Sequence, residues 1–258
     1  MRKVFVLARK DIASYFHSWL GVVVYVFFIT MSAAFFFMLL NNYERLSQDM
    51  AHGATQDAAR MSLTQFVFGS FFMNLGAAMT LLVPVLSMRA FSEEHKHQTL
   101  EFLFTCPLSD FDIVAGKFAS LVWFFILLVL PSAGTIGFLR WAGAELDWGV
   151  LAAGYTGLFL LGISYLALGL FVSTLTDSPV VTAMLTFCAL ALLNGLDWLS
   201  PSLEGRAAQW VNFFSPLAHY RDFTYGIFDF SHLVFFLLFG LYFLFLTLRV
   251  IETRNWKG

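Results

Sequence analysis

Residues 149–172 read GVLAAGYTGLFLLGISYLALGLFV, an apolar run without one charged side chain. A helix needs about 20 mostly apolar residues to cross the hydrocarbon core of a bilayer, and this run is long enough. Runs of comparable length and composition occur along the whole chain, near residues 19–40, 66–88, 114–139, 149–172, 179–199 and 232–250. The sequence therefore predicts an all-α polytopic membrane protein with six transmembrane helices.

The composition leaves no room for a separate soluble domain. Hydrophobic residues make up 59% of the 258 residues and charged residues only 12%, whereas soluble domains carry about 25% charged residues. The stretches between the six runs are too short to build an independent core, so we expect one transmembrane domain over residues 1–258. The first run continues through residues 35–40, which is long enough for an uncleaved span rather than a signal peptide.

Lysine and arginine are unevenly distributed between the two sides of the predicted membrane. Because six is an even number, both termini lie on one side. Ten basic residues fall on that side, namely Arg2, Lys3, Arg9, Lys10, Arg89, Lys96, Lys117, Arg249, Arg254 and Lys257. The other side holds five, namely Arg45, Arg60, Arg140, Arg206 and Arg221. Cytoplasmic loops are enriched in Lys and Arg, so we expect both termini in the cytoplasm.

The N-terminal segment, residues 1–18, has a basic face and an apolar face. Arg2, Lys3, Arg9 and Lys10 lie on one side of a helix, and aromatic and aliphatic side chains lie on the other. An amphipathic helix of this kind lies in the membrane interface, with its basic side chains at anionic lipid headgroups or at a partner. The same pattern also fits a simple basic topology signal, and both interpretations stay open.

The connection between spans two and three mixes charged residues with helical periodicity from Arg89 to Pro107. Ser92 is suited to cap a helix N-terminus, where Glu93 and Glu94 would face the positive end of the helix dipole. A helix usually ends before a proline, so Pro107 closes this segment. We expect a short amphipathic helix at the cytoplasmic surface, with a packed intracellular loop as the alternative.

The last two connections differ in length. Residues 173–179 are long enough only for a tight turn with a polar tip. Residues 200–231 are rich in aromatic side chains and unusually apolar for an exposed loop. We expect them to form short helices that dip into the outer leaflet, with Trp and Tyr as interface anchors.

The sequence contains no motif for catalysis on this chain. A phosphate loop needs G-x-x-x-x-G-K-[ST], and the pair Gly116 and Lys117 lacks both the upstream Gly and the following Ser or Thr. His95 and His97 would point to different sides of a helix, which disfavours a metal site. Asp197 near the end of span five is explained by an interfacial position. We therefore expect no catalytic, cofactor-binding or metal-binding residue and no nucleic-acid partner.

Several short motifs together resemble the type-2 ABC exporter permeases. They are EE at 93–94, TLEFLFTCPLS at 99–109, IVAGK at 113–117 and GLFVSTLT at 169–176. In that family the first part forms a gate helix and a coupling helix that docks on the nucleotide-binding subunit. Gln98 departs from the family, which commonly has Gly at this position. Residues around His219 and Asp222 are similar to the gliding-motility and nitrous-oxide-reductase-maturation permeases.

The resemblance implies a set of partners and a docking site. ATP and Mg would bind to a separate cytoplasmic ATPase, and the permease would pair with a second copy or a related permease in the bacterial cytoplasmic (inner) membrane. Other partners would be membrane lipids and an envelope or periplasmic accessory protein. By analogy the docking residues of the coupling helix are Glu93, Glu94, Thr99, Leu100, Glu101 and Pro107.

The predicted function is that of a permease subunit that couples ATP hydrolysis by the ATPase to the export of an unknown substrate. The alternative is an ATPase-coupled membrane module that does mechanical or regulatory work on envelope proteins without moving a solute. A membrane enzyme would need a cluster of reactive groups, which the sequence does not show. Gly154, Gly157, Gly162 and Gly169 would permit close helix packing, either within the subunit or across a dimer.

Overall fold

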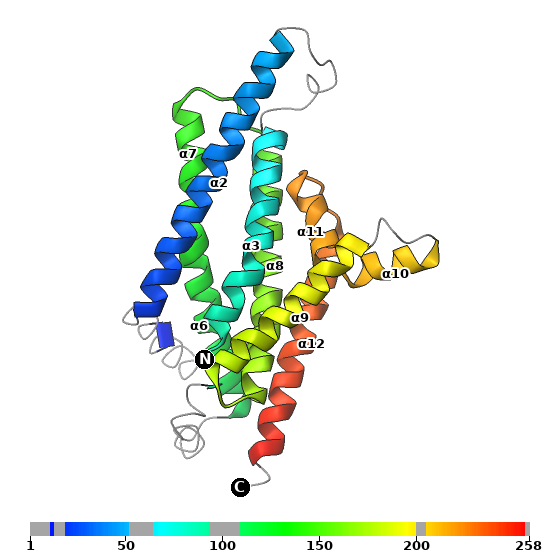
Figure 1. Ribbon diagram of the computed structural model, residues 1–258. Helices are drawn as coiled ribbons and strands as arrows, with labels where there is room; N and C mark the ends of the chain where they lie inside the picture. Colours follow the sequence, from blue (N-terminus) through cyan, green and yellow to red (C-terminus); the bar gives the residue numbers. More distant parts are fainter. Residues whose placement is uncertain (1–10, 13–18, 52–63, 93–108, 200–204, 256–258) are drawn as a thin grey trace.

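A computed structural model describes residues 11–12, 19–51, 64–92, 109–199 and 205–255 of the chain. These residues form helices joined by short turns, without a strand among them. The long helices alternate in direction, so α2 begins and α12 ends at the same end of the bundle (Figure 1). We call this the near end of the bundle; α3 ends there, α6 begins there, and α8 turns there into α9.

Within the described residues, six stretches are long and apolar enough to cross a membrane. They are α2 (Trp19–Ala51), η2 with α3 (Thr64–Phe68 and Gly69–Ser87), α6 with η3 and α7 (Asp110–Val129, Leu130–Ala133 and Gly134–Trp141), α8 (Trp148–Leu175), α9 (Pro179–Leu199) and α12 (Phe230–Asn255). The prediction of an all-helical protein with six spans is thus confirmed. Between α9 and α12, the aromatic-rich connection forms two short helices, α10 (Arg206–Phe214) and α11 (Pro216–Thr224).

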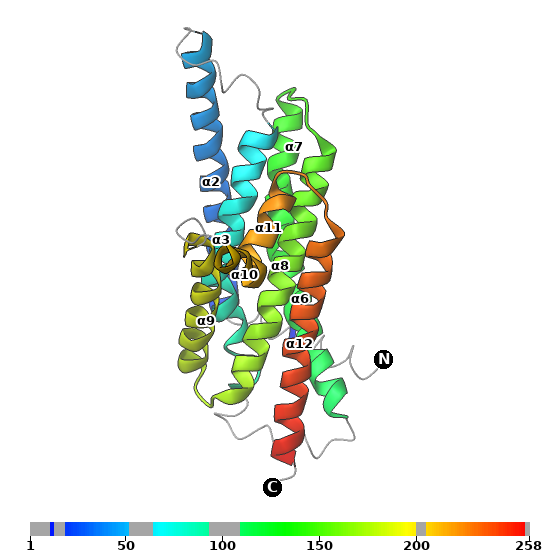
Figure 2. The ribbon, with the colours of Figure 1, turned by 90° about the vertical axis from the view of Figure 1, so that its right-hand side faces the viewer.

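Helix α8 lies in the middle of the bundle. Its most apolar stretch is 72% buried, compared with 22% for α2, 17% for α9 and 22% for α12. Seen after a turn of 90°, α9 and α12 lie on opposite sides of α8, and α8 also contacts α3, α6 and α11 (Figure 2). The outward faces of α2, α9 and α12 are therefore the surfaces left for lipid or for a partner.

The glycines of α8 explain how so many helices approach it. A Cβ atom on Gly154 would lie 2.2 Å from the ring of Phe72 on α3, and one on Gly162 would lie 2.2 Å from the ring of Phe125 on α6. A Cβ atom does not come this close to an atom to which it is not bonded. The two rings therefore pack directly against the backbone of α8, in the space that a side chain would fill. The glycine pattern therefore serves packing within the subunit, which settles the question that the sequence left open.

Polar caps fix where two of the spans begin. At the start of α6 the Ser109 hydroxyl accepts a hydrogen bond from the Asp112 amide (3.1 Å), and the Asp112 carboxylate accepts one from the Ser109 amide (3.3 Å). The Asp147 carboxylate accepts one from the Gly149 amide (2.8 Å) at the start of α8. The Ser109 capping box orders the point where the chain enters span three.

Candidate functional site

At the near end, α3 is followed by a short buried turn, residues 88–92, which we call the 88–92 turn. Ala90, Phe91 and Ser92 are 5%, 2% and 0% exposed. Ser92 directly precedes Glu93, the first acidic residue of the predicted coupling helix. Buried backbone amides and carbonyls need hydrogen-bond partners, and a turn supplies few of its own. The amides of Met88 and Ala90 bond carbonyls of α3, and further partners of the 88–92 turn come from three other helices.

A cluster of hydroxyl groups connects the turn to α8 and α9. The Ser173 hydroxyl at the end of α8 accepts hydrogen bonds from the amides of Phe91 (2.8 Å) and Ser92 (3.2 Å). The Ser92 hydroxyl lies 2.6 Å from the Thr182 hydroxyl on α9, which also contacts Thr176. These side chains are buried or half-buried, so their hydrogen bonds are stronger than hydrogen bonds exposed to water.

Lys117 connects the same turn to α6. Its side chain is buried, and its ammonium group donates a hydrogen bond to the Ala90 carbonyl over 2.6 Å. The ammonium also lies 3.8 Å from the Asp11 carboxylate and 5.0 Å from the centre of the Phe91 ring. A buried charge needs such partners, and here they are a carbonyl, a carboxylate and an aromatic face. The sequence groups Lys117 with the basic loop residues, whereas the structure places it inside span three.

The predicted docking residues lie outside the part of the chain that the structure describes. These are Glu93, Glu94, Thr99, Leu100, Glu101 and Pro107, and the same holds for Arg2, Lys3, Arg9 and Lys10 of the predicted interfacial helix. Both sets stay predictions. What the structure adds is the attachment of this segment at its two ends, by the 88–92 turn on one side and by the Ser109 capping box on the other.

Sequence reasoning misses most of this attachment. The sequence predicts only a polar tip for the turn that Ser173 and Thr182 flank, and it counts Lys117 among the markers of topology. A signal is nevertheless present, because a lysine within an apolar run is costly unless it has a buried partner. The identity of that partner depends on contacts between residues far apart in the chain.

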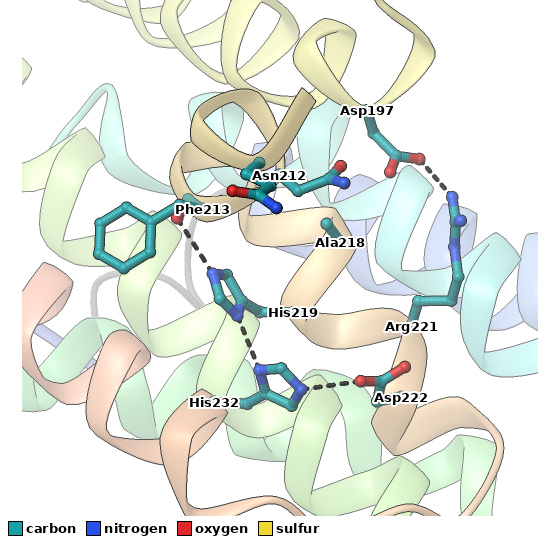
Figure 3. Close-up of a pocket in the computed structure, with 9 residues that line it drawn as sticks. Asp197, Asn212, Phe213, Ala218, His219, Arg221, Asp222 and His232 are labelled. Atoms are coloured by element: carbon teal, nitrogen blue, oxygen red, sulfur yellow. Dashed lines mark hydrogen bonds and ion pairs between the residues drawn. The ribbon is translucent and has the colours of Figure 1, made fainter. Parts of the chain in front are cut away.

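A second polar cluster lies between α9 and α11. Asp197 is 7% exposed, and one of its carboxylate oxygens accepts a hydrogen bond of 2.6 Å from the Arg221 guanidinium (Figure 3). This ion pair joins the end of span five to α11. Tyr220 on α11, expected as an interface anchor, is instead fully buried and donates a hydrogen bond to the Phe72 carbonyl on α3 (2.7 Å).

The comparison with protein families decides the class of the chain. The family model described as "ABC-2 family transporter protein" matches residues 5–250. The chain belongs to this family. No curated protein sequence matches the chain significantly. An ABC-2 permease is a multi-pass membrane component of a transporter, and its family implies a partner ATP-binding cassette ATPase. The resemblance to type-2 ABC exporter permeases is thereby confirmed, while the narrower likeness to gliding-motility and nitrous-oxide-reductase-maturation permeases stays a prediction.

Proposed function

We propose that this ABC-2 permease couples ATP hydrolysis on a separate cytoplasmic ATPase to the export of a substrate, and that residues 93–108 carry the movement. The observation that supports this is the attachment of the 88–92 turn. Ser173 and Thr182 hold it to α8 and α9, and Lys117 holds it to α6. A displacement of the segment would therefore be passed to several spans at once.

The proposal places the near end of the bundle in the cytoplasm, facing the ATPase. The excess of Lys and Arg at this end supports that orientation. ATP and Mg would be held by the ATPase, because this chain lacks a phosphate loop. Closure of the ATPases on ATP would push the coupling segment, and the buried contacts at its base would tilt α6, α8 and α9 together.

A second permease, either a copy of this chain or a related one, would complete the path. The outward face of α9 supports this, because large apolar side chains there are exposed: Val180 at 66%, Met184 at 64% and Leu192 at 74%. The span formed by α9 is also the least buried, at 17%. A substrate would pass between two such faces when the spans tilt apart.

The test is purification of the tagged chain from its native cell in mild detergent, with mass spectrometry of the proteins that co-purify in stoichiometric amounts. We expect an ABC-type ATPase in the eluate. Replacing Glu93, Glu94 and Glu101 by alanine should remove it, because these carboxylates are the predicted contacts. Replacing Glu44 and Glu145, two carboxylates far from the near end, should leave it in place.

Two results would contradict the proposal. The first is reproducible purification of the chain without an ATPase in several mild detergents. The second is an ATPase that is retained in full by the triple alanine variant, which would place its docking surface elsewhere on the chain.

A further inference from the structure

Three helices that follow span five meet around a polar cavity of about 510 Å³ (Figure 3). Within it, side chains of α11 and α12 form a continuous hydrogen-bonded chain. His219 Nε2 lies 3.0 Å from the Phe213 carbonyl of α10, and His219 Nδ1 lies 2.7 Å from His232 Nδ1 of α12. His232 Nε2 lies 2.8 Å from a carboxylate oxygen of Asp222 on α11. The chain thus runs from a carbonyl oxygen through two imidazole rings to a carboxylate.

The acceptors at the two ends determine how many protons the chain holds. A carbonyl only accepts, so His219 Nε2 carries a proton, and an ionised carboxylate only accepts, so His232 Nε2 carries one as well. The two Nδ1 atoms face each other at 2.7 Å, which requires one proton between two lone pairs. Three protons therefore fit in this chain of bonds, one on each Nε2 atom and one between the two Nδ1 atoms.

A fourth proton does not fit this geometry. It would put a hydrogen on both Nδ1 atoms, and two N–H groups cannot point at each other over 2.7 Å. The two rings would have to separate. The 2.7 Å between the two Nδ1 atoms is the length of a hydrogen bond, so a proton is the cation that fits between the rings.

We propose that His219, His232 and Asp222 form a proton-binding site whose uptake of one further proton, on His219, releases the start of α12 from α10 and α11. This goes beyond the coupling of ATP hydrolysis, because it gives the region around α10 and α11, away from the near end, a response to the pH of the compartment that this cavity faces (Figure 1). The ligand is the proton itself, and the response is a change in packing between helices.

The charges around the site make His219 the group that takes up this proton. Asp197 of α9 is already occupied by Arg221 of α11, and Asp222 faces His232. Burial lowers the pKa of His219, and the nearby charge of His232 acts in the same direction, while the hydrogen bond to Phe213 and the Asp222 carboxylate oppose them. His219 therefore takes up its proton below pH 6.5, the ordinary pKa of a histidine being about 6.5.

The surrounding contacts decide which helix moves. Helix α11 is anchored to the core, since Tyr220 and Phe223 are fully buried and Tyr220 bonds the Phe72 carbonyl of α3. Helix α12 is anchored further along, where its Phe236 carbonyl accepts a hydrogen bond of 3.0 Å from Ser164 of α8. Before Phe236, α12 is held to α11 by the histidine pair and by the Phe235 ring, which stacks on His219 with ring centres 4.0 Å apart. This part of α12 is therefore the segment that would swing when its contacts with His219 break.

The first measurement is NMR of the full chain labelled with ¹⁵N-histidine in lipid nanodiscs, with His219→Gln and His232→Gln used for assignment. We expect the His219 imidazole to take up its proton below about pH 6.5, and the ¹⁵N signals of His232 to shift in the same step because the two Nδ1 atoms share one proton. Independent titration of the two rings near the ordinary value would overturn the proposal, as would titration that changes when a chelator is added, because that would indicate a metal ion.

The second measurement is the distance between spin labels on Ala152 of α8 and Phe230 of α12, both exposed, in a background with Cys106→Ser and Cys188→Ser. Lowering the pH from about 7.5 to about 5 should lengthen and broaden the distance distribution. Gln does not titrate, so His219→Gln should abolish this change. Asp229→Asn, which alters a carboxylate at the start of α12 outside the chain of bonds, should keep it. The proposal would be overturned if the distance between the labels does not change with pH. It would also be overturned if the distance changes as much in His219→Gln as in the unsubstituted chain.

Discussion

Replacing Gly157 by alanine is expected to destabilise the folded chain strongly. The new Cβ would lie 2.5 Å from Cβ and 2.8 Å from Cγ of Phe223 on α11. Phe223 is fully buried, and its Cβ is fixed to the backbone, so the clash is relieved only if α11 moves as a whole. Overpacking of this kind costs about 1–3 kcal/mol, and here it also disturbs the helix that carries Arg221 and His219.

Thermal unfolding in detergent would measure this effect, with Gly195→Ala as the matched control. Gly195 lies in α9, where no atom lies within 4 Å of the position that an alanine methyl group would take, so the same substitution there meets open space. Alanine is favoured over glycine in a helix by about 0.5–1 kcal/mol, so the control should unfold at the same temperature or slightly higher. If Gly157→Ala unfolds at the temperature of the unsubstituted chain, the packing of α11 against α8 is wrong.

The six spans could be predicted from the sequence because their signal is local. A run such as 149–172 indicates a helix by length and polarity alone, whatever it packs against. The partners of α8 could not be predicted in this way. Four glycines at helical spacing show that another backbone or ring comes close, but Phe72, Phe125 and Phe223 come from three different helices. That arrangement depends on how the spans are placed around one another.

At the candidate site, too, the helices could be predicted from the local sequence and the contacts between them could not. The amides of Phe91 and Ser92 meet a hydroxyl about 80 residues later in the chain, and a serine at the end of an apolar run looks the same whether it meets water or a buried amide. The histidine pair is closer in sequence, but His219 and His232 lie on opposite sides of a turn. The resemblance points to His219 and Asp222 without their partner on α12.

The attachment of the coupling segment can be tested by replacing Ser173 with alanine. Its hydroxyl accepts hydrogen bonds from two buried amides, those of Phe91 and Ser92, and alanine leaves both without this acceptor. A buried donor that loses its partner costs about 1–3 kcal/mol. The cost falls on the 88–92 turn, so we expect local opening there before the bundle as a whole unfolds.

Hydrogen exchange measured by mass spectrometry would locate the effect. A loss of about 2 kcal/mol corresponds to exchange that is about 30-fold faster, and we expect it in peptides that cover residues 88–92. Thr156→Ala is the matched control on the same helix, because the Thr156 hydroxyl bonds the Ala152 carbonyl of α8 itself (2.7 Å). Acceleration spread evenly over all spans would mean that Ser173 only stabilises the fold. Acceleration confined to the turn, with the ATPase still bound, would show that the base of the coupling segment can be loosened separately from its docking surface.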